Sequence, residues 1–206
     1  MAGFVVAVTG GVASGKSAVT AQFEKHGIVV VDADVVARQV VGVGEDALRE
    51  IATQFGNGIL LADGSLDRVR MRALVFDNPD ARRKLEAITH PRIRALLKSG
   101  CLAAPGPYAL VAIPLLAETG AIQAYSWLSR LLVVDTPVAL QLSRLMARDG
   151  IDSALASGMI AAQASRESRL ALATDVLVND GSLQDMVMPV AKLHAFYVRE
   201  ALSSPS

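Results

Sequence analysis

The chain has 206 residues, 52% of them hydrophobic, which is enough for one domain with a large buried core. Twenty basic residues balance twenty acidic ones, and this neutral charge argues against a general nucleic-acid-binding protein, whose surface would carry a basic excess. No apolar stretch reaches the roughly 18 residues that would suggest a membrane span. Cys101 is the only cysteine, and the N-terminus lacks the pattern of a signal peptide, so we expect a cytoplasmic protein without an internal disulfide.

The first predicted strand covers Phe4 to Thr9, and the residues that follow it read GGVASGKS, a match to the pattern G-x-x-x-x-G-K-[ST]. In such a loop the backbone N–H groups surround the phosphates of a nucleotide, because Gly11 and Gly15 can take conformations that a Cβ would obstruct. Lys16 adds a positive charge. Ser17 stands where a helix begins, so its hydroxyl can hold Mg²⁺ while the helix N-terminus favours the same phosphates. Since a strand precedes the loop and a helix follows it, the pattern indicates a phosphate-binding loop.

The second predicted strand, Ile28 to Asp32, leads to two carboxylates, Asp32 and Asp34. Residues two apart on a strand point to the same side, so we expect both carboxylates to face the crevice beside the phosphate loop. There one carboxylate can accept the proton of an acceptor hydroxyl while the other holds Mg²⁺ through water. A structural alternative stays open, in which Asp34 only caps a helix over Val35 to Val40.

A long insert separates Asp32 from the third predicted strand, Tyr108 to Ile113. It is predicted to be mostly helical, with turns at 56–58, 62–64 and 78–79. The dipeptide His90-Pro91 lies in this insert among apolar residues. A histidine in such a place is more often a hydrogen-bonding residue at a helix end or core edge than a catalyst, so we expect it to support an acceptor site.

The fourth predicted strand, Leu131 to Asp135, and a weaker fifth, Val176 to Val178, are separated by a helical excursion. The excursion holds two pairs of arginines that each share a helix face: Arg144 with Arg148, and Arg166 with Arg169. Guanidinium groups on a lid can close over a triphosphate and neutralise the charge of the moving phosphoryl group. Any one of these arginines can equally be a solvated surface residue.

Strands that alternate with helices predict an α/β fold: a P-loop NTPase with a central parallel five-stranded sheet flanked by helices, plus helical acceptor-binding and lid subdomains. The last predicted element is an amphipathic helix over Ser182 to Ala201. We expect a single domain over 1–206, with the core at about 1–34, 105–136 and 174–206, the acceptor-binding insert at about 35–104 and the lid at about 137–173.

Seven runs of residues together resemble the bacterial dephospho-CoA kinases in order and spacing. They are TGGVASGKS from Thr9, VDADVVARQV from Val31, ADGSL from Ala62, THP from Thr89, IPLLAE from Ile113, LVVD from Leu132 and QASRESRL from Gln163. The phosphate loop is shared by many ATPases and GTPases, whereas the Asp-Ala-Asp run with the following Ala-Arg is more specific. The resemblance implies an enzyme in which ATP, with Mg²⁺, phosphorylates the ribose 3′-hydroxyl of dephospho-CoA, and it makes the acceptor insert a CoA-binding one.

The resemblance also implies a set of site residues. The catalytic residues would be Lys16, Asp34 as the base, and Arg144 in the lid. The ATP would be held by Gly11, Ala13, Ser14, Gly15, Lys16, Ser17, Ala18 and, at the adenine, Asn179. Dephospho-CoA would contact Asp34, Arg38, Asp63, His90 and Leu115, and Mg²⁺ would contact Ser17 and Asp32. Ala13 stands where the family usually has glycine and Ala18 where it has threonine, so we expect Ala13 to take a backbone conformation that tolerates a Cβ.

Other classes of protein fit less well. A GTPase would carry Asn-Lys-x-Asp and Asp-x-x-Gly, and neither string occurs. A non-catalytic nucleotide-binding module would not need Lys16, Ser17 and Asp34 together. Another small-molecule or nucleoside monophosphate kinase shares the architecture and stays open. We expect ATP and dephospho-CoA as partners, no nucleic acid or membrane partner, and a monomer or weak homo-oligomer.

Overall fold

The computed structural model describes residues 2–117 and 121–203, and the chain divides into two compact units. The first unit comprises Met1–Asp32 and Gly100–Ser206. The second unit comprises Ala33–Ser99. In the described residues no helix is both long and apolar enough to cross a membrane.

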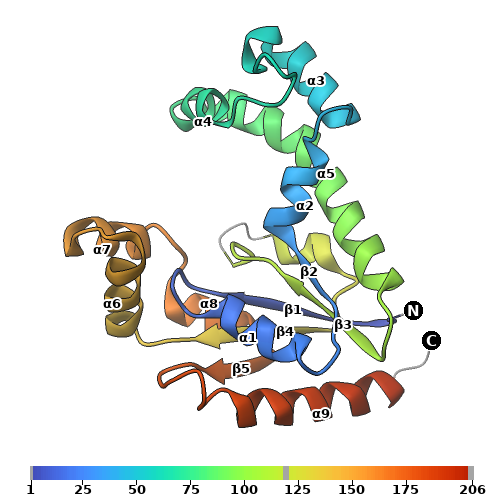
Figure 1. The fold of residues 1–206 in the computed structure, drawn as a ribbon, viewed down its shortest axis with the longest axis vertical. Coiled ribbons are helices and arrows are strands. Elements are labelled where there is room, and N and C mark those ends of the chain that lie inside the picture. Colours follow the sequence, from blue (N-terminus) through green and yellow to red (C-terminus); the bar gives the residue numbers. More distant parts are fainter. Residues whose placement is uncertain (1, 118–120, 204–206) are drawn as a thin grey trace. The chain divides into compact units, whose positions relative to one another are not determined.

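The first unit is built on a sheet of five parallel strands in the order β2-β3-β1-β4-β5 (Figure 1). The strands are β1 (Phe4–Gly10), β2 (Val30–Asp32), β3 (Tyr108–Ala112), β4 (Arg130–Asp135) and β5 (Asp175–Val178). This confirms the predicted sheet, with strand ends shifted by at most two residues. All seven residues of β1 are buried, which is why this strand reads as a continuous apolar run rather than an alternating one.

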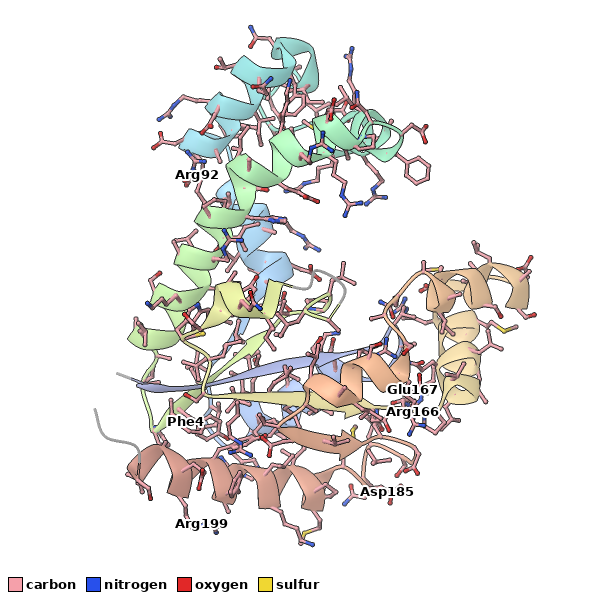
Figure 2. The ribbon with its side chains drawn as sticks, turned by 180° about the vertical axis from the view of Figure 1, so that it is seen from behind. Phe4, Arg92, Arg166, Glu167, Asp185 and Arg199 are labelled. Carbon is pink, nitrogen blue, oxygen red and sulfur yellow. The ribbon has the colours of Figure 1, made fainter. Side chains whose placement is uncertain are left out.

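Helices cover both faces of this sheet. On one face α1 (Lys16–Glu24) and α9 (Val187–Ser203) pack together, and their side chains form a core with the strands that includes Phe23, Tyr108, Leu132, Val190 and Tyr197. Figure 2, drawn from behind, shows α8 (Arg166–Leu172) over the opposite face. The helices α6 (Val138–Asp149) and α7 (Ser153–Ala161) precede α8, and a short helix η2 spans Ala121–Tyr125.

The last helix begins later than predicted, at Val187 instead of Ser182. The Asp185 carboxylate accepts hydrogen bonds from both the backbone N–H and the hydroxyl of Ser182, each at 2.7 Å. Such local side-chain bonds offer the backbone an alternative to helix, and here they hold a turn before the helix starts.

The second unit is mostly helical, as predicted. It contains α2 (Ala33–Val40), α3 (Asp46–Phe55), the short helix η1 (Asn57–Ile59), α4 (Arg68–Phe76) and most of α5 (Pro79–Ala103). Asn78 caps α5 by accepting a hydrogen bond from the N–H of Ala81 at 3.0 Å. Of the two placements expected for His90, the structure shows the core edge and not the helix end, because α5 runs on through Pro91 and leaves His90 half-buried.

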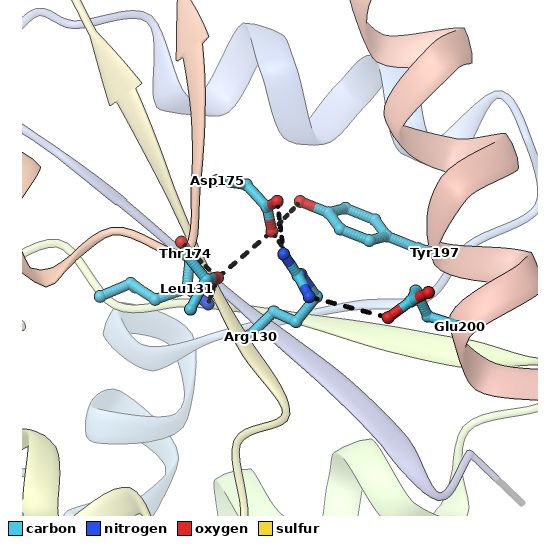
Figure 3. Close-up of polar contacts among 6 residues, drawn as sticks. All are labelled: Arg130, Leu131, Thr174, Asp175, Tyr197 and Glu200. Atoms are coloured by element: carbon cyan, nitrogen blue, oxygen red, sulfur yellow. Dashed lines mark hydrogen bonds and ion pairs between the residues drawn. The ribbon is translucent and has the colours of Figure 1, made fainter. Parts of the chain in front are cut away.

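A polar network joins the starts of β4 and β5 to α9 (Figure 3). Asp175 accepts two hydrogen bonds from Arg130, from Nε at 2.7 Å and Nη2 at 2.9 Å, and a third from the hydroxyl of Tyr197 at 3.1 Å. Glu200 lies 3.7 Å from the same guanidinium. Hydrogen bonding to Asp175 raises the pKa of Arg130, so this guanidinium keeps its positive charge.

Replacing Arg130 with alanine should lower the free energy of unfolding by about 2 to 3 kcal/mol, because it leaves a nearly buried carboxylate without its charge partner. The Asp175 side chain is only 10% exposed. Arg82→Ala is the matched control, since Arg82 pairs with Glu86 on an exposed helix surface and its loss should cost less than about 1 kcal/mol. Urea unfolding followed by circular dichroism measures both. Equal losses in the two variants would show that the network adds nothing.

Candidate active site

The phosphate loop leaves β1 and ends at α1, and its two inner glycines are required by the space around them. Gly15 has a φ of +84°, in the left-handed region that favours glycine. A Cβ there would collide with the side-chain amide of Asn179, and a Cβ at Gly11 would collide with the side chains of Gln141 and Arg169. These contacts come from residues far along the chain, so the loop is enclosed by the rest of the first unit.

Ala13 corrects one expectation. Its φ is +56°, so this residue sits in the left-handed region, which a residue with a Cβ can adopt only at an energetic cost. For a residue with a side chain this costs about 1 to 2 kcal/mol. Such backbone strain persists only where contacts with the surrounding structure hold the residue in place, and strained residues are concentrated at functional sites.

The carbonyl of Ser14 is held by two side chains from the carboxyl ends of other strands. Asn179, which is 4% exposed, donates its side-chain amide to this carbonyl at 2.7 Å. Thr136 donates its hydroxyl to the same carbonyl at 3.0 Å and to the carbonyl of Asn179 at 3.0 Å. Sequence reasoning placed Asn179 at the adenine and missed Thr136. Both residues fix the loop itself.

A cavity of about 340 Å³ opens beside the start of α1. It is lined by Gly15, Ala18, Arg144, Asn179 and Met186, among others. Arg144 donates hydrogen bonds to the carbonyls of Asn179 at 3.2 Å and Gly181 at 3.1 Å, which holds its guanidinium at the cavity wall. The volume is at the lower end of the range for small-molecule sites, about 300 to 1,000 Å³, and suits a nucleoside.

The other three arginines of the excursion have partners elsewhere. Arg148 makes two hydrogen bonds to its neighbour Asp149. Arg166 makes two to Asp135, at 2.7 and 2.6 Å, and this partner lowers the pKa of the Asp135 carboxyl (Figure 2 labels Arg166). Arg169 is buried and donates to the carbonyl of Ala164. The four arginines thus have different partners, and Arg169 also lies against Gly11 of the phosphate loop. That they act on a triphosphate stays a prediction.

The two aspartates differ in backbone context from the prediction. β2 ends at Asp32 and α2 begins at Ala33, so Asp34 stands in the first turn of a helix. The argument from strand alternation is therefore wrong, and Asp34 is not in the capping position either. Asp32 lies at the carboxyl end of β2, two strands from β1, so its backbone is about 10 Å from that of Val8, the residue in register with it on β1.

Among the described residues no group of three or more His, Cys, Asp or Glu side chains is placed to hold a metal. Mg²⁺, however, is usually bound by one or two protein ligands together with substrate phosphates and water. Ser17, exposed in the first turn of α1, and the exposed carboxylate of Asp32 fit this type of site.

The remaining predicted substrate residues fall in different places. In the second unit, Arg38 is exposed in the last turn of α2, and Asp63 accepts hydrogen bonds from the backbone and hydroxyl of Ser65. These bonds lower the pKa of Asp63. Leu115, in the first unit, follows β3 and is 51% exposed. That Asp34, Arg38, Asp63, His90 and Leu115 contact dephospho-CoA stays a prediction, and Glu118 of the family run lies outside the described residues.

Two buried side-chain oxygens in the described part of the chain have no hydrogen-bond partner, Ser14 Oγ and Gln141 Oε1. Both belong to residues at the phosphate loop, and Gln141 is 2% exposed. Buried polar groups are nearly always paired, so such exceptions need an explanation. Their position at the loop indicates that polar groups are kept here for function at a cost in stability.

Comparisons with known proteins identify the family of this chain. The family model of the dephospho-CoA kinases matches residues 4–185. A dephospho-CoA kinase of Xanthomonas campestris pv. campestris is 58% identical over 204 residues, covering 99% of this chain and 98% of the relative. One from Xanthomonas oryzae pv. oryzae is 56% identical over 197 residues, covering 96% and 97%.

The likeness extends to a solved structure. The dephospho-CoA kinase from Campylobacter jejuni superimposes with a TM-score of 0.72 at 28% identity, covering 97% of this chain and 99% of that one. The match to the family includes the phosphate loop, both aspartates and the helices that follow β4. The chain belongs to the dephospho-CoA kinase family.

Proposed function

We propose that this protein transfers the γ-phosphoryl group of ATP to the ribose 3′-hydroxyl of dephospho-CoA. The observation that carries the proposal is the phosphate loop, enclosed by Asn179, Thr136 and Gln141 beside a cavity that suits a nucleoside. The chain's membership of a kinase family names the acceptor.

In this reaction the chain's own residues bind and orient the substrates and move a proton. The N–H groups of the loop and the start of α1 hold the phosphates. Lys16 neutralises charge that develops on the β- and γ-phosphates. Ser17 and Asp32 would hold Mg²⁺, which supplies further charge neutralisation when bound. Asp34 accepts the proton of the acceptor hydroxyl as that oxygen attacks the γ-phosphorus.

The acceptor is tested by measuring ADP formation with a panel of dephospho-CoA, AMP, UMP and gluconate. We expect dephospho-CoA to give the highest kcat/KM by at least about a hundredfold, because the family membership of the chain points to this acceptor and an enzyme discriminates among substrates by the binding energy that it gains in the transition state. Rapid phosphorylation of a mononucleotide with no turnover of dephospho-CoA would favour a different kinase of the same fold.

The resemblance implied a catalytic role for Arg144 in the lid, and that role stays a prediction. From its place at the cavity wall we propose that Arg144 also holds the nucleoside of ATP. Its guanidinium lines the cavity beside Ala18 and can stack on a purine ring. Arg144→Ala should raise the Kd for ATP by about tenfold. Arg148→Ala, one helical turn further along, removes an arginine paired with Asp149 and should leave the Kd unchanged. Isothermal titration calorimetry measures the Kd for ATP of both variants. Equal Kd values would show that Arg144 does not contribute to ATP binding.

The proposal places the enzyme in the cytoplasm as a monomer or weak homo-oligomer. Size-exclusion chromatography with light scattering, across a range of protein concentrations, measures the oligomeric state.

A further inference from the structure

The phosphate loop donates a hydrogen bond to a residue outside the predicted site. Gln163 Oε1 accepts from the backbone N–H of Val12 at 2.7 Å, across 151 residues of sequence. Gln163 lies in the segment between α7 and α8 and is half-buried. The hydrogen bond therefore joins this segment directly to the backbone of the loop.

The segment that carries Gln163 is itself firmly held. Its own N–H donates to the carbonyl of Ile160 at 3.2 Å, which closes the end of α7. On the other side, Ser165 caps α8 by accepting from the N–H of Ser168 at 3.1 Å. The Arg166 pair with Asp135 then anchors the start of α8 to the end of β4. A side chain on such a firmly held segment can keep the group that it contacts in one position.

The part of the phosphate loop that Gln163 contacts lies next to a strained residue. Val12 precedes Ala13, the residue with a φ of +56°, and Ser14 follows it. The loop is thus held on both sides of its strained residue, by Gln163 at Val12 and by Asn179 and Thr136 at Ser14. A left-handed conformation at a residue with a Cβ is maintained only by such surroundings.

We propose that Gln163 is a positioning residue of the phosphate loop: its hydrogen bond to Val12 keeps the loop in the form that binds the phosphate groups of the nucleotide. The inference rests on the proposed function. It makes the helical excursion after β4 a determinant of phosphate affinity through the loop backbone, without contact between Gln163 and the nucleotide. Asn179 and Thr136 hold one side of the loop in the same way.

The test replaces Gln163 with leucine, which has a similar size but no acceptor. The Kd for ATP and the Kd for inorganic tripolyphosphate, both measured by isothermal titration, should rise by the same factor of about ten, because a neutral hydrogen bond that preorganises the loop is lost. Hydrogen exchange of the backbone over residues 10–15 should become faster in the free protein, while exchange over α9 stays unchanged. The KM for dephospho-CoA should stay within about twofold.

Ser165→Ala is the matched control, because it removes the cap of α8 and destabilises the same segment without touching the loop. We expect this variant to lose a similar amount of thermal stability and to keep wild-type Kd values and wild-type exchange over residues 10–15. If it weakens tripolyphosphate binding as much as Gln163→Leu does, stability of the segment and not the hydrogen bond is responsible, and the inference is overturned. It is also overturned if Gln163→Leu binds both ligands like the wild type. A wild-type protein that binds neither ATP nor tripolyphosphate would instead refute the proposed function.

Discussion

Replacing Lys16 with alanine should lower kcat by a factor of about a hundred or more. The reason is that the ammonium group stabilises charge on the β- and γ-phosphates more in the transition state than in bound ATP. Lys16 begins α1 directly after Gly15, so no other residue of the loop can deliver a cation to the same place. Steady-state kinetics with ATP and dephospho-CoA measures the loss.

The control for this variant is Lys25→Ala. Lys25 is exposed at the other end of the same helix, where its charge lies far from the phosphates. Its replacement should leave kcat unchanged. A folded Lys16→Ala protein with near-wild-type turnover would remove the phosphate loop from the mechanism.

Replacing Asp34 with asparagine should also lower kcat, by a factor of about a hundred to ten thousand, because the variant keeps the shape of the side chain and loses the general base. The effect of this replacement on the free energy of unfolding should be small. Asp34 stands in the first turn of α2, where a negative charge interacts favourably with the helix dipole, a contribution of about 0.3 to 1 kcal/mol. Kinetics and thermal unfolding of the same preparation separate the two roles.

Asp46→Asn provides a matched comparison, since Asp46 stands in the first turn of α3 and has no place in the proposed mechanism. It should lose a similar amount of stability and keep full activity. An Asp34→Asn protein that unfolds at a much lower temperature, yet is fully active where folded, would show that Asp34 serves only the helix.

The elements of the fold that are determined by residues close together in the sequence could be predicted. Each buried parallel strand is a continuous apolar run, because helices cover both faces of the sheet, and the phosphate loop follows the first of them. The start of α2 was predicted at Val35 and lies at Ala33, and α5 continues through Pro91. Local preference at Asp34 and Pro91 was outweighed by the helices that continue through these positions.

The hydrogen bonds that hold the phosphate loop in place could not be predicted from the sequence. Asn179 meets Ser14 across 165 residues and Gln163 meets Val12 across 151, and sequence periodicity carries no information on such pairs. The left-handed backbone at Ala13 was missed because alanine gives no signal of it. The family resemblance implied that Asn179 is a site residue, but only the structure shows its contact with the phosphate loop.

The identity of the acceptor atom tests the central claim most directly. The protein is incubated with ATP, Mg²⁺ and dephospho-CoA, and the product is analysed by mass spectrometry and by phosphorus–proton coupling in nuclear magnetic resonance. We expect a product that is heavier by one phosphoryl group, with the new phosphorus coupled to the ribose 3′ proton. Unchanged dephospho-CoA, or a phosphate on any other hydroxyl, would contradict the account.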